Sequence, residues 1–287
     1  REASAAIHLE MGRVLSRAPL APALLGLQAM AASSHPDRTG WIERLCSGEY
    51  LPLHLLPALT QTRGDGRIDG TIEGFFDADL ASHVVAALPG RYLLIPIAAD
   101  GVSLHEQTMW DETRRMFTVR LDGWLPGADA VLAEGDAATA LHDALSPQAH
   151  LALVADSLGG AEAILALTID YLNTRRQFDR PLALFQALKH RVADLKVKQA
   201  AAQALLWSRA GDASASRTDI AALKALACDV YAETAEEAVQ LHGGVGLTSE
   251  YYCHLFLKRA LLNAVLSGSS DYWNEAAGRQ ALKELAA

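Results

Sequence analysis

The alternation of apolar and polar residues divides the chain into three regions of different texture. Residues 1–48 repeat apolar positions at helical spacing, with interruptions at "RAPLAP" and "SSHPDRTG". Residues 49–135 hold short β-branched or alternating runs, separated by Gly, Pro and Asp at intervals typical of strands: "GRIDGTIEGF", "HVVAAL", "RYLLIPI" and "MFTVRLDGWLPGADAVL". From residue 136 to the end the helical pattern returns.

Two apolar stripes predict long helices in this last region. One stripe steps by three, four or seven residues through Leu184, Leu188, Val192, Leu195, Ala202 and Leu206, with Gln199 as its polar member. The other passes through Ile220, Leu223, Ala227, Val230, Thr234, Ala238 and Leu241, and Gly243 and Gly244 follow as a helix stop. Further helices are expected over 147–174, 249–266 and 270–285.

These patterns together predict an α+β, mostly α-helical protein with several domains. We expect an N-terminal helical remnant over 1–48, a small central β domain over 49–135 and an antiparallel helical bundle over 136–287.

Composition and charge restrict the classes of partner and compartment. The 287 residues carry a net charge of −9 without a basic, aromatic-rich stretch, which argues against nucleic acid. The ten histidines and three cysteines (Cys46, Cys228 and Cys253) show no metal-ligand spacing, and no uninterrupted apolar run is long enough to cross a membrane. We therefore expect a cytoplasmic protein with reduced thiols and no metal.

The segment "TRRQFDRPLALFQ", residues 174–186, lies between two predicted long helices, and Pro181 is expected near the first turn of the second helix. Arg175, Arg176 and Arg180 should converge around Phe178. Guanidinium groups suit a diphosphate, and an aromatic ring suits a nucleobase or flavin edge. A solvated helix–helix turn with an aromatic anchor would produce the same composition.

The segment "QLHGGVGL", residues 240–247, ends the next long helix. Its glycines allow close approach of another backbone or of phosphates, although helix capping alone explains Gly243 and Gly244 equally well. The segment neither follows a strand nor matches GxGxxG, so by itself it is a weak signal.

The combination of the two segments, about 55 residues apart, resembles the C-terminal domain of acyl-CoA dehydrogenases. "EMGRVLSRAPL" (10–20) is similar to the family's E-x-G-R segment, and "TVRLDGWLPGADAVL" (118–132) to its last β-domain strand and following loop. The resemblance implies helices, β domain and bundle in that order, with the family's first helices absent or truncated.

In that family FAD lies at a subunit interface, and the neighbouring chain contacts its ADP part. The resemblance implies that Arg175 contacts the diphosphate, and that Phe178 and Gln186 belong to the same half-site. Gln240, Leu241, His242, Gly243 and Gly244 match the turn at the adenosine end, and Ser269 matches a further cofactor position. Asp179 departs from the family, which usually has Gly at that position.

The same resemblance implies that the catalytic base is missing. The family's base is a Glu placed 27 residues beyond the Gln of QxxGG, and from Gln240 that count reaches Ser267. Gly268, Ser269 and Ser270 then match the family's G-T-S. A serine hydroxyl is too weak a base to take the α-proton of a thioester. Relatives with the Glu on the preceding helix would place it at Ala149, beside His150.

The β domain departs from the family as well. "LTQTRGDGRIDGTIEGFFDADL" (59–80) lacks the Glu, the Gly-Ser-Asp and the Trp that mark the family's flavin loop. We therefore expect no catalytic residue in this chain, which should support the shared FAD of a Glu-bearing homologous subunit. Heteromeric α2β2 acyl-CoA dehydrogenases of bacterial steroid side-chain degradation are the implied model, with an acyl-CoA substrate and an electron-transfer flavoprotein as acceptor.

Two alternatives stay open. A self-sufficient enzyme of this family would need a relocated base, for which Glu250, Asp271 or His150 are candidates. A scaffold or binding protein would keep the bundle and abandon catalysis. The lack of a G-x-S-x-G segment and of a strand before the Ser267–Ser270 turn argues against a serine hydrolase.

Overall fold

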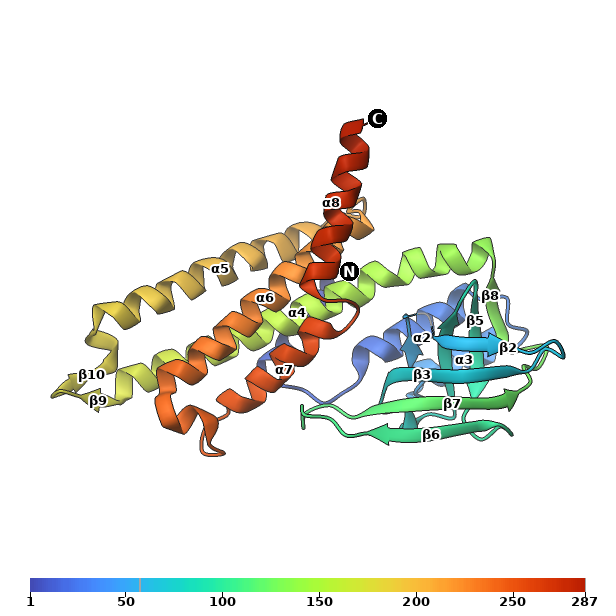
Figure 1. Cartoon of the computed structure of the whole chain (residues 1–287), viewed down its shortest axis with the longest axis horizontal. Helices are drawn as coiled ribbons and strands as arrows, with labels where there is room; N and C mark the ends of the chain where they lie inside the picture. Colours follow the sequence, from blue (N-terminus) through green and yellow to red (C-terminus); the bar gives the residue numbers. More distant parts are fainter. Residues whose placement is uncertain (57, 287) are drawn as a thin grey trace. The chain divides into compact units, whose positions relative to one another are not determined.

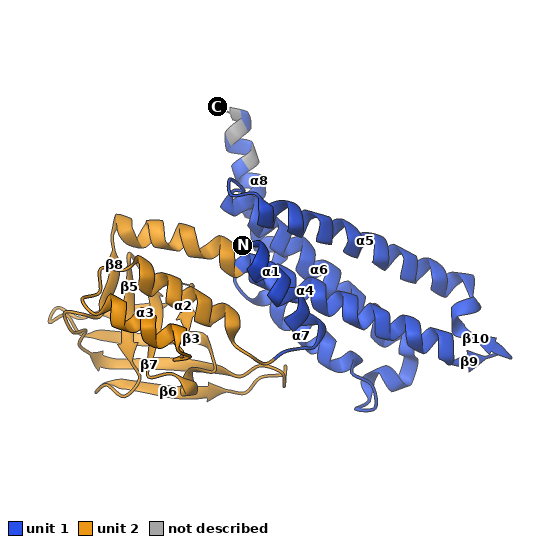
Figure 2. Cartoon of the chain, turned by 180° about the vertical axis from the view of Figure 1, so that it is seen from behind, with its two compact units in different colours: residues 1–16, 150–287 blue, residues 17–149 orange. Residues whose placement is uncertain are grey.

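A computed structural model describes residues 1–56 and 58–286. The chain forms two compact units (Figure 2): unit 1 contains residues 1–16 and 150–287, and unit 2 contains residues 17–149. The predicted α+β architecture, with N-terminal helices, central strands and a C-terminal helical bundle, is confirmed (Figure 1).

Unit 2 combines two complete helices and the first part of a third, residues 136–149, with two four-stranded sheets. The complete helices are α2 (Leu20–Ala32) and α3 (Arg38–Cys46). One sheet has the order β1 (Leu53–His54), β4 (His83–Leu88), β5 (Arg91–Pro96) and β8 (Val131–Glu134). The other has the order β2 (Leu59–Thr62), β3 (Ile68–Phe76), β7 (Met116–Trp124) and β6 (Val102–Gln107). The short helix η1 (Ala78–Leu80) follows β3.

Strand β4 shows why this segment is apolar on both faces. Val84, Ala86 and Leu88 lie in the core between the two sheets, whereas Val85 and Ala87 lie in the core shared with α2 and α3. Successive side chains of a strand point to opposite faces, so a strand covered on both sides reads as a continuous apolar run. The "HVVAAL" segment is therefore a central strand in a three-layered unit.

Unit 1 is an all-helical bundle apart from one short hairpin (Figure 1). Its long helices are α4 (Asp136–Thr174), which enters the unit at residue 150, α5 (Gln186–Gly211) and α6 (Arg217–His242). The shorter elements are α1 (Glu2–Arg13), β9 (Arg176–Gln177), β10 (Arg180–Pro181), η2 (Leu182–Leu184), η3 (Gly243–Leu247), α7 (Cys253–Val265) and α8 (Ser270–Ala286).

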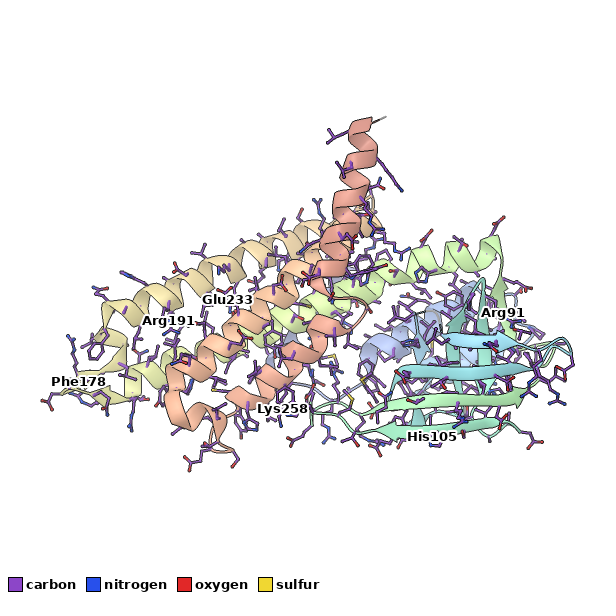
Figure 3. The ribbon with its side chains drawn as sticks, viewed as in Figure 1. Arg91, His105, Phe178, Arg191, Glu233 and Lys258 are labelled. Atoms are coloured by element: carbon purple, nitrogen blue, oxygen red, sulfur yellow. The ribbon has the colours of Figure 1, made fainter. Side chains whose placement is uncertain are left out.

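Ion pairs join α5 to α6 along their exposed sides. The Arg191 Nε donates to Glu237 Oε2 at 2.7 Å, and the Lys198 Nζ lies 2.6 Å from Glu233 Oε1; Figure 3 labels Arg191 and Glu233. The polar residue of the first predicted stripe, Gln199, is buried and donates from Nε2 to the carbonyl of Ala161 on α4 at 2.9 Å. Its amide therefore links two helices, which explains a glutamine on an apolar stripe.

The N-terminal helix α1 packs into unit 1 at a close helix crossing. A Cβ on Gly12 would lie 2.1 Å from the Asp156 carbonyl oxygen, and one on Gly159 would lie 1.9 Å from the Leu9 carbonyl oxygen. Only glycines permit this approach of α1 to α4. The Arg13 guanidinium then pairs with Glu162 of α4 at 2.6 Å.

Several predicted boundaries are corrected. The helix expected from 147 begins at Asp136 and includes Pro147. The helix expected from 249 begins at Cys253. Leu184 belongs to η2 and is 52% exposed, so the first stripe starts later, because α5 begins at Gln186. Strand β6 was not predicted, although Val102 and Leu104 alternate with exposed residues.

The expected domain boundaries at 48 and 135 stay a prediction, since the compact units divide the chain differently, after residues 16 and 149. Helix α4 is long and apolar enough to cross a membrane by length and composition, but 67% of its apolar window is buried inside the protein. This burial identifies α4 as a core helix.

Candidate functional site

The segment between α4 and α5 forms a tight β-hairpin. Strands β9 and β10 pair Arg180 with Gln177, and the two residues between them, Phe178 and Asp179, have φ of +51° and +61°. Two positive φ values in a two-residue loop define a type I′ turn, which favours Gly or Asn. This geometry explains why a glycine suits the position of Asp179.

The arginines of this hairpin do not converge as predicted. Arg176 donates to the Asp179 carbonyl at 2.6 Å, and the guanidinium of Arg180 lies 4.0 Å above the ring of Phe185. Pro181 lies in β10 rather than in the first turn of α5, because the hairpin and η2 intervene. Phe178 lies at the tip of the hairpin and is 86% exposed (Figure 3). Its ring makes an edge-to-face contact with the ring of Phe185.

Three exposed side chains near these helix ends are left without a partner. Arg175 follows the last turn of α4, Gln186 begins α5, and Gln240 lies in the last turn of α6. Among the described residues, none of the three side chains makes a hydrogen bond or ion pair. We refer to Arg175, Phe178, Gln186, Gln240 and the Gly243–Gly244 turn as the helix-end surface.

The two glycines of this turn differ in what they require. Gly243 has φ +64° and ψ −145°, a conformation that essentially only glycine adopts. Gly244 has no positive φ, and a Cβ built on it meets nothing within 4 Å. Helix capping therefore explains Gly243, whereas nothing in the described chain requires a glycine at 244.

The two residues before this turn face inward. Leu241 and His242 are buried, with 6% and 4% exposure, so only their backbone is left for a ligand. The His242 ring stacks on Tyr171 at 4.3 Å between centroids, and its Nδ1 lies 2.7 Å from the Ala238 carbonyl. Burial lowers the pKa of His242 below its usual value.

Tyr171 and Tyr251, which complete this aromatic contact, were not predicted as functional residues. Tyr171 lies on the last turn of α4, four residues before Arg175, and its hydroxyl donates to the His242 carbonyl at 3.2 Å. The sequence offered two signals: a histidine at the end of an apolar helix, and a tyrosine one turn before a candidate ligand residue. Neither signal indicates that these two residues contact each other.

The Ser267 turn, residues 266–270, is held by bonds from its own chain. Ser267 has φ +57°, and its carbonyl accepts a 2.8 Å hydrogen bond from Trp273 Nε1. Lys224 Nζ donates to the Gly268 carbonyl at 2.5 Å and to the Ala264 carbonyl at 3.1 Å. Ser269 precedes α8 and accepts from the Tyr272 amide at 3.4 Å.

A buried polar network lies behind this turn. Arg259 on α7 pairs with Asp156 on α4 at 3.3 Å, and Asn263 Nδ2 donates to Asp156 at 2.8 Å and to Ser157 at 3.1 Å. Burial lowers the pKa of Lys224 and raises the pKa of Cys228, which adjoins the network. Most polar atoms of these groups are paired with one another, as expected of a structural network, although among the described residues Asn263 Oδ1 is buried without a hydrogen-bond partner.

The candidate substitute bases have ordinary structural surroundings. Glu250 is exposed before α7, and Asp271 is exposed in the first turn of α8, where a carboxylate favours the helix N-terminus. His150 is 2% exposed with its ring 4.9 Å from that of Trp273, and Ala149 lies in an apolar core.

The segment that departs from the family's flavin loop folds as a closed hairpin in unit 2. Strands β2 and β3 pair Leu59 with Thr71 and Thr62 with Ile68, and the Arg63 amide donates to the Arg67 carbonyl at 2.7 Å. An ion pair between Arg63 and Asp69 closes it further. Within the described residues no group of three His, Cys, Asp or Glu could hold a metal ion.

Comparison with known proteins gives a consistent result. A family model described as the acyl-CoA dehydrogenase C-terminal domain matches residues 147–282. The chain is similar to acyl-CoA dehydrogenase IpdE2 of Mycobacterium tuberculosis, with 33% identity over 263 residues, covering 90% of this chain and 70% of that protein. With IpdE2 of Mycolicibacterium smegmatis it shares 38% identity over 180 residues, 61% of this chain and 54% of that protein.

Solved structures share the fold. A variant of the Tcur3481-Tcur3483 steroid ACAD matches with a TM-score of 0.87 and 24% identity, covering 100% of this chain and 82% of that one. The ChsE4-ChsE5 complex from Mycobacterium tuberculosis matches with a TM-score of 0.84 and 23% identity, covering 97% and 80%.

Proposed function

The chain belongs to the acyl-CoA dehydrogenase family, and we propose that it is the non-catalytic subunit of a heteromeric, FAD-dependent acyl-CoA dehydrogenase. In this proposal the helix-end surface contacts the ADP part of an FAD whose flavin is held by a homologous, Glu-bearing subunit. The complex removes hydrogen from the α- and β-carbons of a CoA thioester.

The observation that carries the proposal is the unpaired state of the helix-end surface. Arg175, Gln186 and Gln240 are exposed and have no partner among the described residues, and Gly244 faces open space. A guanidinium can bind a diphosphate with two parallel hydrogen bonds, and a residue without Cβ lets a nucleotide approach the backbone. These residues therefore fit the ADP part of FAD.

The described part of this chain offers no carboxylate at the position expected for removal of the α-proton. When bound, FAD supplies a hydride acceptor for the β-hydrogen, but the α-proton needs a carboxylate base. The position expected for that base is Ser267, whose hydroxyl is too weak a base, and Trp273 and Lys224 hold only the backbone carbonyls of its turn. A homologous subunit must then provide the base.

A bulky, steroid-type acyl group is the substrate class we favour. Two solved structures with this fold are the Tcur3481-Tcur3483 steroid ACAD variant and the ChsE4-ChsE5 complex. Both match nearly the whole length of this chain. In the same proposal an electron-transfer flavoprotein reoxidises the flavin.

Flavin absorbance per chain, combined with native mass, tests the proposal. The chain alone should be colourless, and co-expression with a Glu-bearing homologous subunit should give a yellow complex with about one flavin for each pair of chains. Replacing the partner's Glu by Gln should abolish turnover. A chain that binds flavin alone, in equal amount, and oxidises an acyl-CoA would contradict the proposal and favour a relocated base.

A further inference from the structure

Three aromatic side chains of unit 1 connect the end of α4, which Arg175 follows, with the end of α6, which the Gly243–Gly244 turn follows. We call Tyr171, His242 and Tyr251 the Tyr171 cluster. Tyr171 and His242 stack with their ring planes 22° apart, and Tyr251 meets both rings edge-on at 5.4 Å and 5.3 Å between centroids. The cluster joins the last turn of α4, the last turn of α6 and the segment before α7.

Tyr171 is bonded to both parts of the surface. Its own carbonyl accepts the Arg175 amide at 2.8 Å, which places Arg175 directly after the last turn of α4. Its hydroxyl donates to the carbonyl of His242 at 3.2 Å, and Gly243 follows directly. His242 directly precedes the short helix η3, so this hydroxyl attaches the start of the glycine turn to α4.

The remaining contacts of His242 hold its ring but not the turn that follows. Its Nδ1 lies 2.7 Å from the Ala238 carbonyl, within the same helix. A Cβ built on Gly243 or Gly244 would meet nothing within 4 Å, so the turn is open on the side where a side chain would lie. The Tyr171 hydroxyl ties the start of this turn to α4, the helix that Arg175 follows.

We propose that Tyr171 is a positioning residue that sets the separation between Arg175 and the Gly243–Gly244 turn, so that both meet one nucleoside diphosphate together. Tyr171 itself touches no ligand. The inference rests on the proposed function, because it assumes the ADP part of FAD as that ligand. A ligand held at two points binds more weakly when either point is mobile, because the conformational entropy lost in ordering that point reduces the free energy of binding.

The first arm of the test needs no ligand. Amide hydrogen exchange is measured on the full chain, comparing wild type with Tyr171→Phe, which keeps the ring stack and removes the hydroxyl. We expect exchange across 243–247 to accelerate about three- to tenfold, the loss of one hydrogen bond. Tyr252→Phe, an exposed tyrosine close in sequence to the cluster, is the matched control and should leave these amides unchanged.

The second arm uses the FAD-containing complex with a Glu-bearing homologous subunit. The affinity for FAD is measured in wild type, Tyr171→Phe, Arg175→Gln and the double variant. Tyr171→Phe should weaken FAD about three- to tenfold, and its effect should shrink markedly when Arg175 is already replaced. A purely structural tyrosine would not produce this dependence on Arg175.

Each failure has a distinct pattern. If Arg175→Gln leaves FAD affinity unchanged, the proposed function itself is wrong. If Arg175→Gln weakens FAD but Tyr171→Phe does not, or if the two effects simply multiply, the positioning role is overturned while the half-site stands. Unchanged exchange across 243–247 in Tyr171→Phe would overturn the positioning role independently of FAD.

Discussion

The helix-end surface and the Ser267 turn both follow helices of unit 1 and both carry polar groups, yet these groups are satisfied in opposite ways. At the Ser267 turn the carbonyls of Ser267 and Gly268 are taken by Trp273 and Lys224. At the helix-end surface, Arg175 and Gln240 are exposed without a partner among the described residues. Polar groups that are bonded within the chain have a structural role, whereas exposed groups beside an open glycine keep their donors and acceptors free for a ligand.

The largest effect is expected behind the Ser267 turn. Arg259→Met should destabilise the protein by about 3–5 kcal/mol, because it leaves Asp156 buried without its cation. The free energy of unfolding in urea measures this loss. Arg279→Met removes an exposed pair with Glu275 and should leave the unfolding midpoint in place; an equal loss in both variants would contradict the distinction.

At the helix-end surface, removing a positive charge should weaken the binding of FAD without changing the stability of the fold. Arg175→Gln should weaken FAD in the heteromeric complex about 10- to 100-fold, the worth of a charge-assisted contact to phosphate. The unfolding midpoint of the chain should not move, because Arg175 has no partner in the described chain to lose. Lys283→Gln makes the same charge change on exposed α8 and should leave FAD affinity unaltered.

The two adjacent glycines sharpen the comparison within a single turn. Gly243→Ala should cost about 1–3 kcal/mol, because its φ and ψ exclude a side chain. Gly244→Ala should instead stabilise the chain by about 0.4–1 kcal/mol while weakening FAD in the complex. Urea unfolding and flavin retention, measured on both variants, separate a structural glycine from a ligand-facing one; equal destabilisation would remove that separation.

The smallest effect concerns acidity at the Tyr171 cluster. Burial holds the pKa of His242 below its ordinary 6.5, so the unfolded chain binds this proton more readily than the folded chain. The stability contributed by neutral His242 is complete above that pH and is lost as the pH falls below it. His242→Phe should flatten this part of the profile of unfolding free energy between pH 7.5 and 5, and an unchanged slope would contradict the assignment.

Local patterns predicted the elements well and their pairings poorly. The short apolar run in "HVVAAL" and the stripe ending at Leu206 identified a strand and a helix, because each reflects the geometry of one element. Pro147 inside α4 was not foreseen, since a long helix tolerates a proline where tertiary packing supports it. The 178–179 turn carries Phe at its first position, where Asn, Asp or Gly is preferred, and Asp at its second, where Gly is preferred.

The candidate site was predictable in part. The motifs located Arg175 and the Gly243–Gly244 turn, and the structure leaves both open. The contact between Tyr171 and His242 joins residues 71 positions apart, and the Arg259–Asp156 pair joins residues 103 apart. Such pairs depend on how helices pack, which a single sequence does not encode in any local spacing.

The crossing of α1 at Gly12 and Gly159 bears on how the chain is made. A ribosome completes α1 before residues 17–149 and only afterwards the helices onto which Ala5 and Leu9 pack. Unit 2, continuous in sequence, can fold while α1 still lacks its partners, so unit 1 is completed last, from segments that precede and follow unit 2. During synthesis the apolar face of α1 therefore stays uncovered until α4 arrives.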